Sequence, residues 1–584
     1  MVTVATDDDT DPAIAEGQTI VEGKRLVKVR NDVGLSLSER IANQFYRLTW
    51  RTPLHGLRLR GRHPLKLLAV PKDAFAGDKA LGSALLDGAL HWRGERVAIA
   101  DLSFTETNWS RGFSDHVHSF VWLRNLDAAA PRAQAAPVAE AIMRKWLAAH
   151  GEKVTEPAWR SDLWGQRILN LAAHAPLILS SQDLVYRSSV LNALARGARH
   201  LDQTADRAVF GLQRISAWIG IVAAGLLIAG GKPRQAFGEA GLAKALVSGI
   251  GSDGGIICRT PHNQAELVIL LSMLRNVYDA RQIMPPGFLI DALMRAVPAL
   301  LAVTLGDGGL SSWQGSAPAP AGTVEAIIAG SQIRARPLRQ PRDWGYHRLA
   351  ADQTVMVVDA APPPVSRVMG GGCASTLAFE VSDGVHRLVI NCGGANAGGI
   401  HLPASLAEGL RTTAAHSTLI IADSNSTAIH ADGTLGKGVT EVALDRQENE
   451  GSSRIEATHD GYAKRFGLTH RRTINMSADG REIRGEDVLL PAEKKRKRAT
   501  FPFAIRFHLG PDVEPTPTAD SMGALLRIDG GALWQFRARG GALQIDESLW
   551  IDGEGRVHSS TQLVVLGEVP PGGATIGWAF KRAG

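Results

Sequence analysis

Cysteine is scarce in this sequence of 584 residues, and its scarcity excludes a fold built on disulfides. The three cysteines are Cys258, Cys373 and Cys392, which is too few for the paired framework of a disulfide-rich domain. Cys373 and Cys392 flank one predicted hairpin, so a bridge between them is geometrically conceivable. We favour three free, buried thiols in a reducing compartment.

Long apolar runs are also missing. The most apolar stretch extends from Trp218 to Gly230, and it is shorter than the roughly 20 residues that a membrane-spanning helix needs. We therefore expect a buried helix there and no membrane span. The first residues, MVTVATDDDTDPAIAEG, contain neither a basic segment nor an apolar one. Because a signal peptide needs both, we expect a cytoplasmic protein.

Neither charge sign dominates the composition. The net charge is +6, with 45% hydrophobic and 21% charged residues, which is typical of a soluble globular protein. A small positive excess favours an anionic partner only weakly. The one basic run, Lys494–Arg498, lies between two predicted strands, and we interpret it as a solvated hairpin tip. No accompanying motif indicates a nucleic-acid partner.

The chain is too long for one ordinary core, so at least two domains are expected. We expect a disordered tail over residues 1–30, because this segment is acidic and poor in apolar residues. Residues 31–340 form a predicted helical domain that ends in a linker, 305–342, rich in Gly, Pro and Ser. Apolar residues with helical spacing and short intervening loops predict seven helices: Pro137–His150, Trp164–Ala173, Gln182–Leu201, Thr204–Ala229, Gln235–Ile250, Pro261–Ala280 and Pro286–Thr304.

Residues 343–584 change to alternation with a period of two, which is typical of half-buried strands. Turn signals recur at short intervals and predict an antiparallel β-sandwich. The segments expected to be strands are Gln353–Val358, Thr376–Val381, Val385–Asn391, Ser417–Ala422, Val439–Leu444, Ser453–Thr458, Leu468–Asn475, Glu482–Leu490, Ala504–Leu509, Ala524–Ile528, Leu533–Arg537, Gln544–Leu549 and Thr561–Leu566.

One hairpin, Gly370–Gly394, carries the most specific pattern in the chain. It reads GGGCASTLAFEVSDGVHRLVINCGG, with two alternating strands around a Ser-Asp-Gly turn. It resembles the hairpin that opens the β-domain of the heparinase II/III family of polysaccharide lyases. Other stretches with counterparts in that family are Trp109 with His118–Arg124, Asp253–Gly255 leading to Arg259–Pro261, Gly345–Leu349, Thr413–Leu419, His459–Tyr462 with His470–Arg472, and Arg506–Leu509. The likeness spans roughly residues 105 to 580 and implies a multidomain α and β protein, an N-terminal (α/α) incomplete toroid followed by a C-terminal antiparallel β-sandwich.

The resemblance also shows which chemistry this sequence has lost. In the family the hairpin usually carries a catalytic His and, in a second His and an Asp, ligands for zinc. Here the hairpin positions hold Gly371, Cys373, Ser375 and Asn391. Only His416 of the zinc triad is retained, and one His, one thiol and one amide make a poor zinc site. We therefore expect no metal and no cofactor.

The remaining family catalysts are also replaced. The family usually has a Tyr after its Arg-Ser-Pro segment, and this position falls at Asn263. Its Asn-His pair falls near Leu212 and Gln213. None of these side chains, nor Gly371, exchanges protons near neutral pH. Elimination beside a uronate needs a base, an acid and a group that neutralises the carboxylate, so a lyase on this chain must use other residues.

The candidate catalytic residues are therefore those that can still exchange protons near the retained motifs: His416, Tyr462 and His470. Candidate substrate-binding residues are Arg259, His262, Asn263, Arg411 and His459. Each has a structural alternative: a salt bridge for Arg259, a hydrogen-bonded core histidine for His416, and plain packing for the group around Tyr462.

Two functions remain open. The first is a carbon–oxygen lyase that acts on an acidic, uronate-containing polysaccharide with a divergent catalytic set. The second is a catalytically inactive glycan-binding or scaffolding protein on the same fold. A hydrolase with paired carboxylates is less well supported, because no such pair stands out in the sequence. The family resemblance leaves the cell envelope or periplasm as an alternative location, and the oligomeric state is open.

Overall fold

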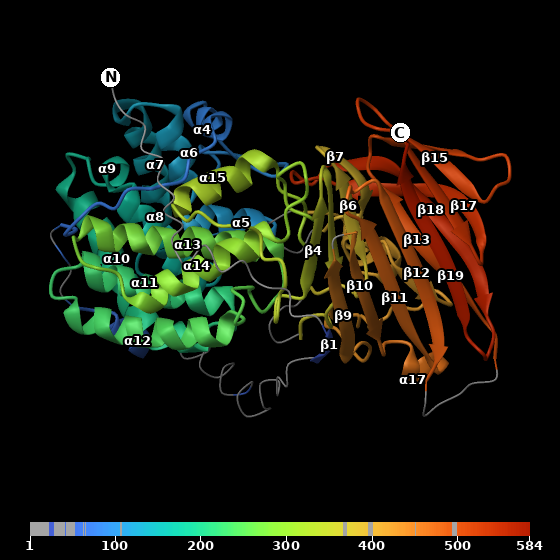
Figure 1. Ribbon diagram of the computed structural model, residues 1–584. Helices are drawn as coiled ribbons and strands as arrows, with labels where there is room; N and C mark the ends of the chain where they lie inside the picture. Colours follow the sequence, from blue (N-terminus) through green and yellow to red (C-terminus); the bar gives the residue numbers. More distant parts are fainter. Residues whose placement is uncertain are drawn as a thin grey trace, which may run out of the picture.

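The protein forms two bodies, a helical one and a β-rich one, that lie side by side (Figure 1). The computed structural model describes residues 23–28, 41, 53–61, 64, 66–105, 108–365, 371–394, 401–449, 451–492 and 499–583. The predicted basic hairpin tip, Lys494–Arg498, lies outside these residues.

The N-terminal body is built almost wholly from α-helices. Its helices are α3 (Pro53–Arg58), α4 (Lys79–Leu86), α5 (Arg111–Ser119), α6 (Trp122–Ala129), α7 (Arg132–His150), α8 (Ser161–Ala173), α9 (Ala175–Ile178), α10 (Leu184–Thr204), α11 (Leu212–Leu227), α12 (Lys232–Gly249), α13 (Pro261–Ala280), α14 (Gly287–Leu301) and α15 (Ala321–Ser331). A short hairpin of β2 (Ala89–Trp92) and β3 (Glu95–Ala98) is attached to them.

Local chemistry explains several helix ends. Pro261 occupies the first turn of α13, where a missing N–H costs nothing, and α13 has the predicted bounds. The Thr260 side chain does not cap this helix, and its hydroxyl donates to the Cys258 carbonyl at 3.3 Å. The helix predicted from Thr204 begins only at Leu212, because Gly211 has a φ of 86° that ends the preceding loop.

The C-terminal body is a sandwich of two antiparallel sheets. One sheet has the order β1-β9-β10-β11-β12-β19-β16-β15-β14 and the other β17-β18-β13-β7-β6-β5-β4, with β8 paired to β13. Their bounds are β1 (Gly23–Lys28), β4 (Tyr346–Ala351), β5 (Thr354–Asp359), β6 (Phe379–Asp383), β7 (His386–Ile390), β8 (Leu419–Ile421), β9 (Glu441–Asn449), β10 (Ser452–His459), β11 (Leu468–Ser477), β12 (Glu482–Pro491), β13 (Phe501–Leu509), β14 (Val513–Pro517), β15 (Gly523–Ile528), β16 (Trp534–Arg539), β17 (Ala542–Ile551), β18 (Val557–Val569) and β19 (Ala574–Arg582).

Strand β1 corrects the prediction that residues 1–30 form a disordered tail. Residues 23–28 pair antiparallel with β9, from Gly23 opposite Arg446 to Lys28 opposite Glu441. Arg25 of β1 also donates to the carbonyls of Pro341 and Arg342, at 3.1 and 2.6 Å. This strand is stabilised by a partner some 400 residues away in the sequence, so local composition gave no sign of it.

The Gly-, Pro- and Ser-rich segment predicted as a linker is packed between the two bodies. Trp313 is fully buried, and so are its neighbours Ser312 and Gln314. Asp253, on the loop after α12, accepts hydrogen bonds from three successive backbone N–H groups, those of Arg342, Asp343 and Trp344, at 2.7–2.8 Å. The chain therefore passes from one body to the other along a fixed path.

Each body has its own apolar core. Buried tryptophans, among them Trp122, Trp146 and Trp164, lie in the helical core, and Phe379, Phe507 and Trp578 lie between the two sheets. The three cysteines are free and buried, as predicted. Within the part of the chain that the structure describes, no helix has the length and hydropathy needed to cross a membrane.

Candidate functional site

Arg259 lies on the loop before α13 and extends into the boundary between the two bodies. Its guanidinium donates to the Trp344 carbonyl at 3.0 Å and the Pro362 carbonyl at 2.8 Å. It forms an ion pair with Asp359 at 2.5 Å, with side chains 6% and 0% exposed, and it packs over the Tyr346 ring. These contacts occupy the guanidinium, which is the structural alternative considered for Arg259. Its role in substrate binding stays a prediction.

The hairpin positions that resemble the family zinc site are held by hydrogen bonds to their neighbours. Ser375 donates to Asp359 at 2.7 Å, and Gln314 accepts from the Cys373 backbone N–H at 2.8 Å. Asn391 donates to Glu380 at 2.9 Å and to the Ser312 carbonyl at 3.2 Å. Among the described residues, no group of three His, Cys, Asp or Glu side chains is placed to hold a metal ion.

His416 and Arg411, two further candidates, are buried near this hairpin. His416 donates from Nδ1 to the Thr412 carbonyl at 2.7 Å, and burial lowers the pKa of its imidazole to about 4. Arg411 donates to the carbonyls of Gly372 and Gly433, at 2.9–3.0 and 2.7 Å. Both side chains tie loops together, which is the structural alternative considered for His416.

The predicted proton-handling group of His459 and His470 lies inside the sandwich. The Gly461 N–H donates to His459 Nδ1 at 3.1 Å, and His459 Nε2 lies 3.2 Å from His470 Nδ1. His470 Nε2 then lies 2.6 Å from Asp487, which also pairs with Arg472 at 2.7 Å. Asp487 fixes the tautomers of both histidines, because a carboxylate can only accept a hydrogen bond. His470 therefore donates from Nε2 to Asp487 and accepts at Nδ1 from His459 Nε2, and His459 accepts at Nδ1 from Gly461. Every group in this chain is satisfied with both histidines neutral.

Tyr462 belongs to the same interior. Its hydroxyl donates to the Leu419 carbonyl at 2.9 Å, and its side chain is 1% exposed. Burial raises the pKa of the phenol above its ordinary value, which is opposite to the lowered value expected beside a cation. His470 is 0% and His459 1% exposed, so the structure places this group in the core of the sandwich. Its action on a substrate stays a prediction.

A different group, on α13, has the exposure that a ligand would need. His262 and Glu266 lie one turn apart on this helix, with side chains 33% and 28% exposed and His262 Nε2 3.9 Å from Glu266 Oε2. Gln166 of α8 donates to the other Glu266 oxygen at 2.5 Å. Asn263, also a predicted site residue, instead donates to Cys258 Sγ at 3.3 Å.

The surroundings of Glu266 keep its proton affinity high. Burial raises the pKa of its carboxyl to about 7, and the nearby carboxylates of Asp162 and Asp115 add to the effect, while Arg124 opposes it. Asp162 and Asp115 are both held by Arg160, which bonds to Asp115 at 2.6 Å. Raised carboxyl pKa values of this kind, in partly exposed groups, are typical of functional sites.

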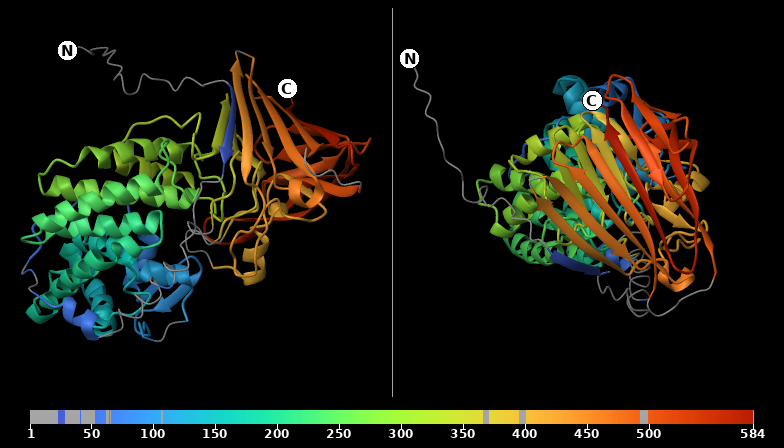
Figure 2. Two further views of the ribbon diagram at one scale, coloured as in Figure 1. Left: turned by 90° about the horizontal axis from the view of Figure 1, so that it is seen from below. Right: turned by 45° about the vertical axis from the view of Figure 1, so that its right-hand side comes forward.

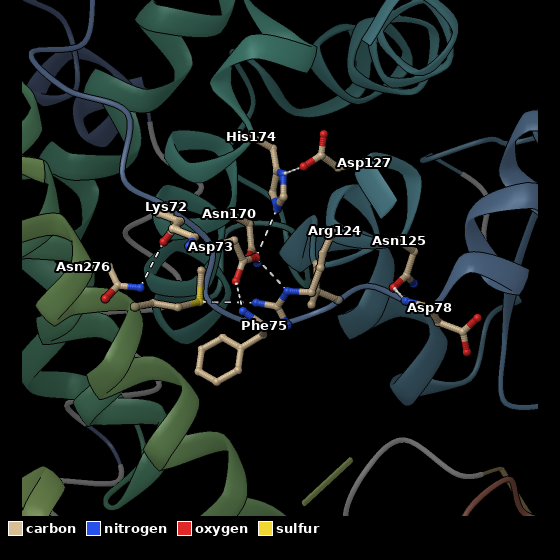
Figure 3. Close-up of polar contacts among 12 residues, drawn as sticks. Lys72, Asp73, Phe75, Asp78, Arg124, Asn125, Asp127, Asn170, His174 and Asn276 are labelled. Carbon is tan, nitrogen blue, oxygen red and sulfur yellow. Dashed lines mark hydrogen bonds and ion pairs between the residues drawn. The ribbon is translucent and has the colours of Figure 1, made fainter. Parts of the chain in front are cut away.

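Arg124 is itself fixed by a polar network across the helical body (Figure 3). It pairs with Asp73 at 2.7 Å and contacts Met273 Sδ at 3.6 Å. His174 reaches the same Asp73 oxygen at 3.2 Å, and Asp127 lies 3.5 Å from its other ring nitrogen. Burial alone would raise the pKa of Asp73, but the His174 and Arg124 contacts outweigh it and lower the pKa. These contacts hold the segment that contains Asp73, before α4, in place against α6, α8 and α13.

Comparison with known proteins identifies the C-terminal body. Residues 333–579 match the family model of the heparinase II/III-like C-terminal domain. The crystal structure of heparinase III aligns with a TM-score of 0.68 and 14% identity, over 95% of this chain and 93% of that one. A heparan sulfate lyase mutant from Pedobacter heparinus aligns with a TM-score of 0.59 and 12% identity, over 94% and 89%.

These likenesses confirm the predicted fold, a helical toroid followed by a β-sandwich. A curated relative is much closer in sequence than either lyase structure. The protein named FtsZ-localized protein C, from Caulobacter vibrioides, is 29% identical over 560 residues, which cover 91% of this chain and 92% of the relative.

Two groups in this structure were not predicted from the sequence. Glu266 was not singled out, because an acid in the second turn of an amphipathic helix has no local signature. Asp487, which fixes the buried histidines, lies on the strand next to His470 and is paired through the sheet register, Arg472 opposite Asp487. The sequence did contain a signal for Glu266. The family Tyr falls at Asn263, and Glu266 follows it by three residues, so the two positions share one face of the helix.

Proposed function

We propose that this heparinase II/III-like chain is a binding protein that localises with FtsZ and does not eliminate polysaccharide. The single observation that carries the proposal is the likeness to FtsZ-localized protein C over 91% of the chain. The loss of the usual family catalysts supports it, because Asn263 and Gly371 cannot transfer protons. The burial of His416, Tyr462 and His470 supports it too.

The test uses FtsZ from Caulobacter vibrioides, the source of the relative. The purified full chain is mixed with FtsZ under polymerising and non-polymerising conditions and pelleted, with heparinase III as a control of the same fold. We expect this chain, and not heparinase III, to pellet with the polymers. A fluorescent fusion expressed in Caulobacter cells should follow FtsZ in position. A chain that stays in the supernatant and spreads evenly through the cell would contradict the proposal.

A second candidate function is the binding of an acidic saccharide, and one observation favours it. The partly exposed pair of His262 and Glu266 lies in the helical body of a fold shared with the crystal structure of heparinase III, and Arg93, in the turn between β2 and β3, is near enough to lower the pKa of His262. These side chains can bind hydroxyl and carboxylate groups without any of the lost catalysts. Calorimetric titration with uronate oligosaccharides tests this function independently of FtsZ.

A further inference from the structure

The stretch that begins in α3 and continues beyond it is strongly basic. Leu57–Lys66 reads LRLRGRHPLK, with four lysine or arginine residues and no acidic one. Arg58 ends α3, Arg60 follows two residues later, and both side chains are exposed. Among the described residues, neither of these two arginines has an acidic partner. Cations concentrated in this way raise the local concentration of anions.

Two arginines of α10 lie against this stretch. Arg199 donates from Nη1 to the Leu59 carbonyl at 2.9 Å. Arg196, one turn earlier, donates to the Glu152 carbonyl at 2.9 Å. Burial lowers the pKa of Arg196, and although the Glu152 carboxylate opposes this, the charge of Arg60 adds to it. The two segments therefore bring their cations close enough to affect one another.

An arginine of α12 extends the same surface. Arg234 pairs with Asp202 of α10 through two nitrogens, at 2.8–3.2 Å. Burial lowers the pKa of Arg199, and the charges of Arg234 and Arg196 lower it further, while Asp202 raises it. Two carboxylates, those of Asp202 and Glu152, thus face a larger set of cations. We call that set the basic face: Arg58, Arg60, Arg196, Arg199 and Arg234.

One buried donor of the basic face lacks a partner. Arg196 is 8% exposed, and its Nε has no hydrogen-bond partner among the described residues. A buried polar atom of this kind needs an explanation, and crowded like charges add to its cost. An anion bound at the face would lower the repulsion among the arginines. The basic face shares no residue with the group around Glu266, and the helical body that carries it lies beside the β-rich body in both views of Figure 2.

We propose that the basic face binds an acidic segment of a partner protein through its aspartate or glutamate side chains. A guanidinium and a carboxylate match as a two-point fork. The arginines lie at different depths, from the exposed Arg58 and Arg60 to the buried Arg196. Flexible acidic side chains can approach such donors one by one, whereas a lipid headgroup layer is flat and the phosphates of a nucleic acid are evenly spaced. This surface goes beyond the localisation with FtsZ proposed above and does not depend on it.

The experiment is a titration of a fluorescently labelled hexaglutamate peptide with the full chain, followed by fluorescence anisotropy. It is run at about 50 mM and about 200 mM salt, between which the Debye length falls from about 14 to about 7 Å. We expect saturable binding at the lower salt concentration and weaker binding at the higher one. A labelled hexaglutamine peptide, which has the same length and no charge, should not bind.

A double variant locates the binding on the basic face. Arg58→Gln combined with Arg60→Gln should lower the affinity at least about tenfold at the lower salt concentration, because it removes two charge-assisted pairs. Since both side chains are exposed, its unfolding midpoint should equal that of the wild type. Arg481→Gln combined with Arg484→Gln removes the same charge from exposed positions on the sandwich. This matched control should bind like the wild type.

The outcomes are distinguishable. Hexaglutamate that does not bind at the lower salt concentration overturns the proposal, and so does binding that the Arg58 and Arg60 variant leaves unchanged. A thymidine oligonucleotide and vesicles that contain phosphatidylglycerol test the other sources of an anion. If either binds more tightly than hexaglutamate and loses that binding in the same variant, an acidic protein segment is overturned as the occupant of the face.

Discussion

Replacing Asp359 with Asn should destabilise the boundary between the two bodies strongly. The substitution keeps the shape of the side chain but removes the charge that faces Arg259, and the two side chains are 0% and 6% exposed. Leaving one member of a buried ion pair without its partner costs about 3–5 kcal/mol. The substitution also weakens a hydrogen bond, because Ser375 donates to the Asp359 carboxylate at 2.7 Å and an amide oxygen is a weaker acceptor.

The measurement is urea unfolding followed by tryptophan fluorescence, and its readout is the midpoint of the first transition, because a two-body chain need not unfold in one step. Glu514→Gln is the control, since its pair with Arg527 has side chains 70% and 75% exposed and should contribute nothing measurable. A midpoint for Asp359→Asn equal to that of the wild type would refute the structural role assigned to Arg259. That result would favour the sequence-based prediction that Arg259 binds substrate.

Two further predictions concern buried polar groups, and a third concerns packing between the sheets. In the folded state, burial lowers the pKa to about 3 for His116, His200 and His508 and to about 4 for His150 and His416. Each therefore contributes stability that is present above the unfolded pKa near 6.5 and lost as pH falls, about 2 kcal/mol each by pH 5. Burial raises the pKa of Glu266 and Glu380 to about 7, and these two groups act in the opposite direction. Because the buried histidines outnumber them, thermal melts should show a net loss of stability from pH 7 to pH 5, and equal stability at both pH values would contradict these burial effects. Asp487→Asn should lower the free energy of unfolding by about 3–5 kcal/mol. It should also change the tautomer of His470 in the histidine NMR spectrum, and an unchanged spectrum would contradict the role assigned to Asp487. Gly485→Ala should cost about 1–3 kcal/mol by overpacking, because its Cβ would lie 2.0 Å from the Trp578 ring, whereas Gly577→Ala meets no atom within 4 Å and should unfold like the wild type.

The sequence predicted most elements whose signal is local. The period-two segments from residue 353 onward correspond to strands, and α13 was predicted with its bounds. What failed depends on distant partners. Strand β1 forms by pairing with β9, and the 305–342 segment is buried because it packs against the other body. Strands β4, β14 and β19 were not predicted as separate elements, because short or Gly- and Pro-containing runs carry weak alternation.

The candidate site shows the same limit. Motif resemblance pointed to His459, Tyr462 and His470, because a retained motif does not tell whether its side chains face a ligand or a core. In a sandwich, alternate strand residues face inward, as His459 of β10 and His470 of β11 do, and Tyr462, in the segment after β10, is buried as well. The residues left for a ligand, Arg93 and Glu266, gain their significance from neighbours on other elements, which no local pattern records.

The proposed function implies that this chain keeps a lyase fold without the elimination chemistry. The most direct test is the ultraviolet absorbance of unsaturated uronate, measured during long incubation of the full chain with alginate, hyaluronan and heparan sulfate, with heparinase III on heparan sulfate as the positive control. The account predicts no rise above buffer with any of the three polymers. A steady rise that scales with the amount of this chain would contradict it.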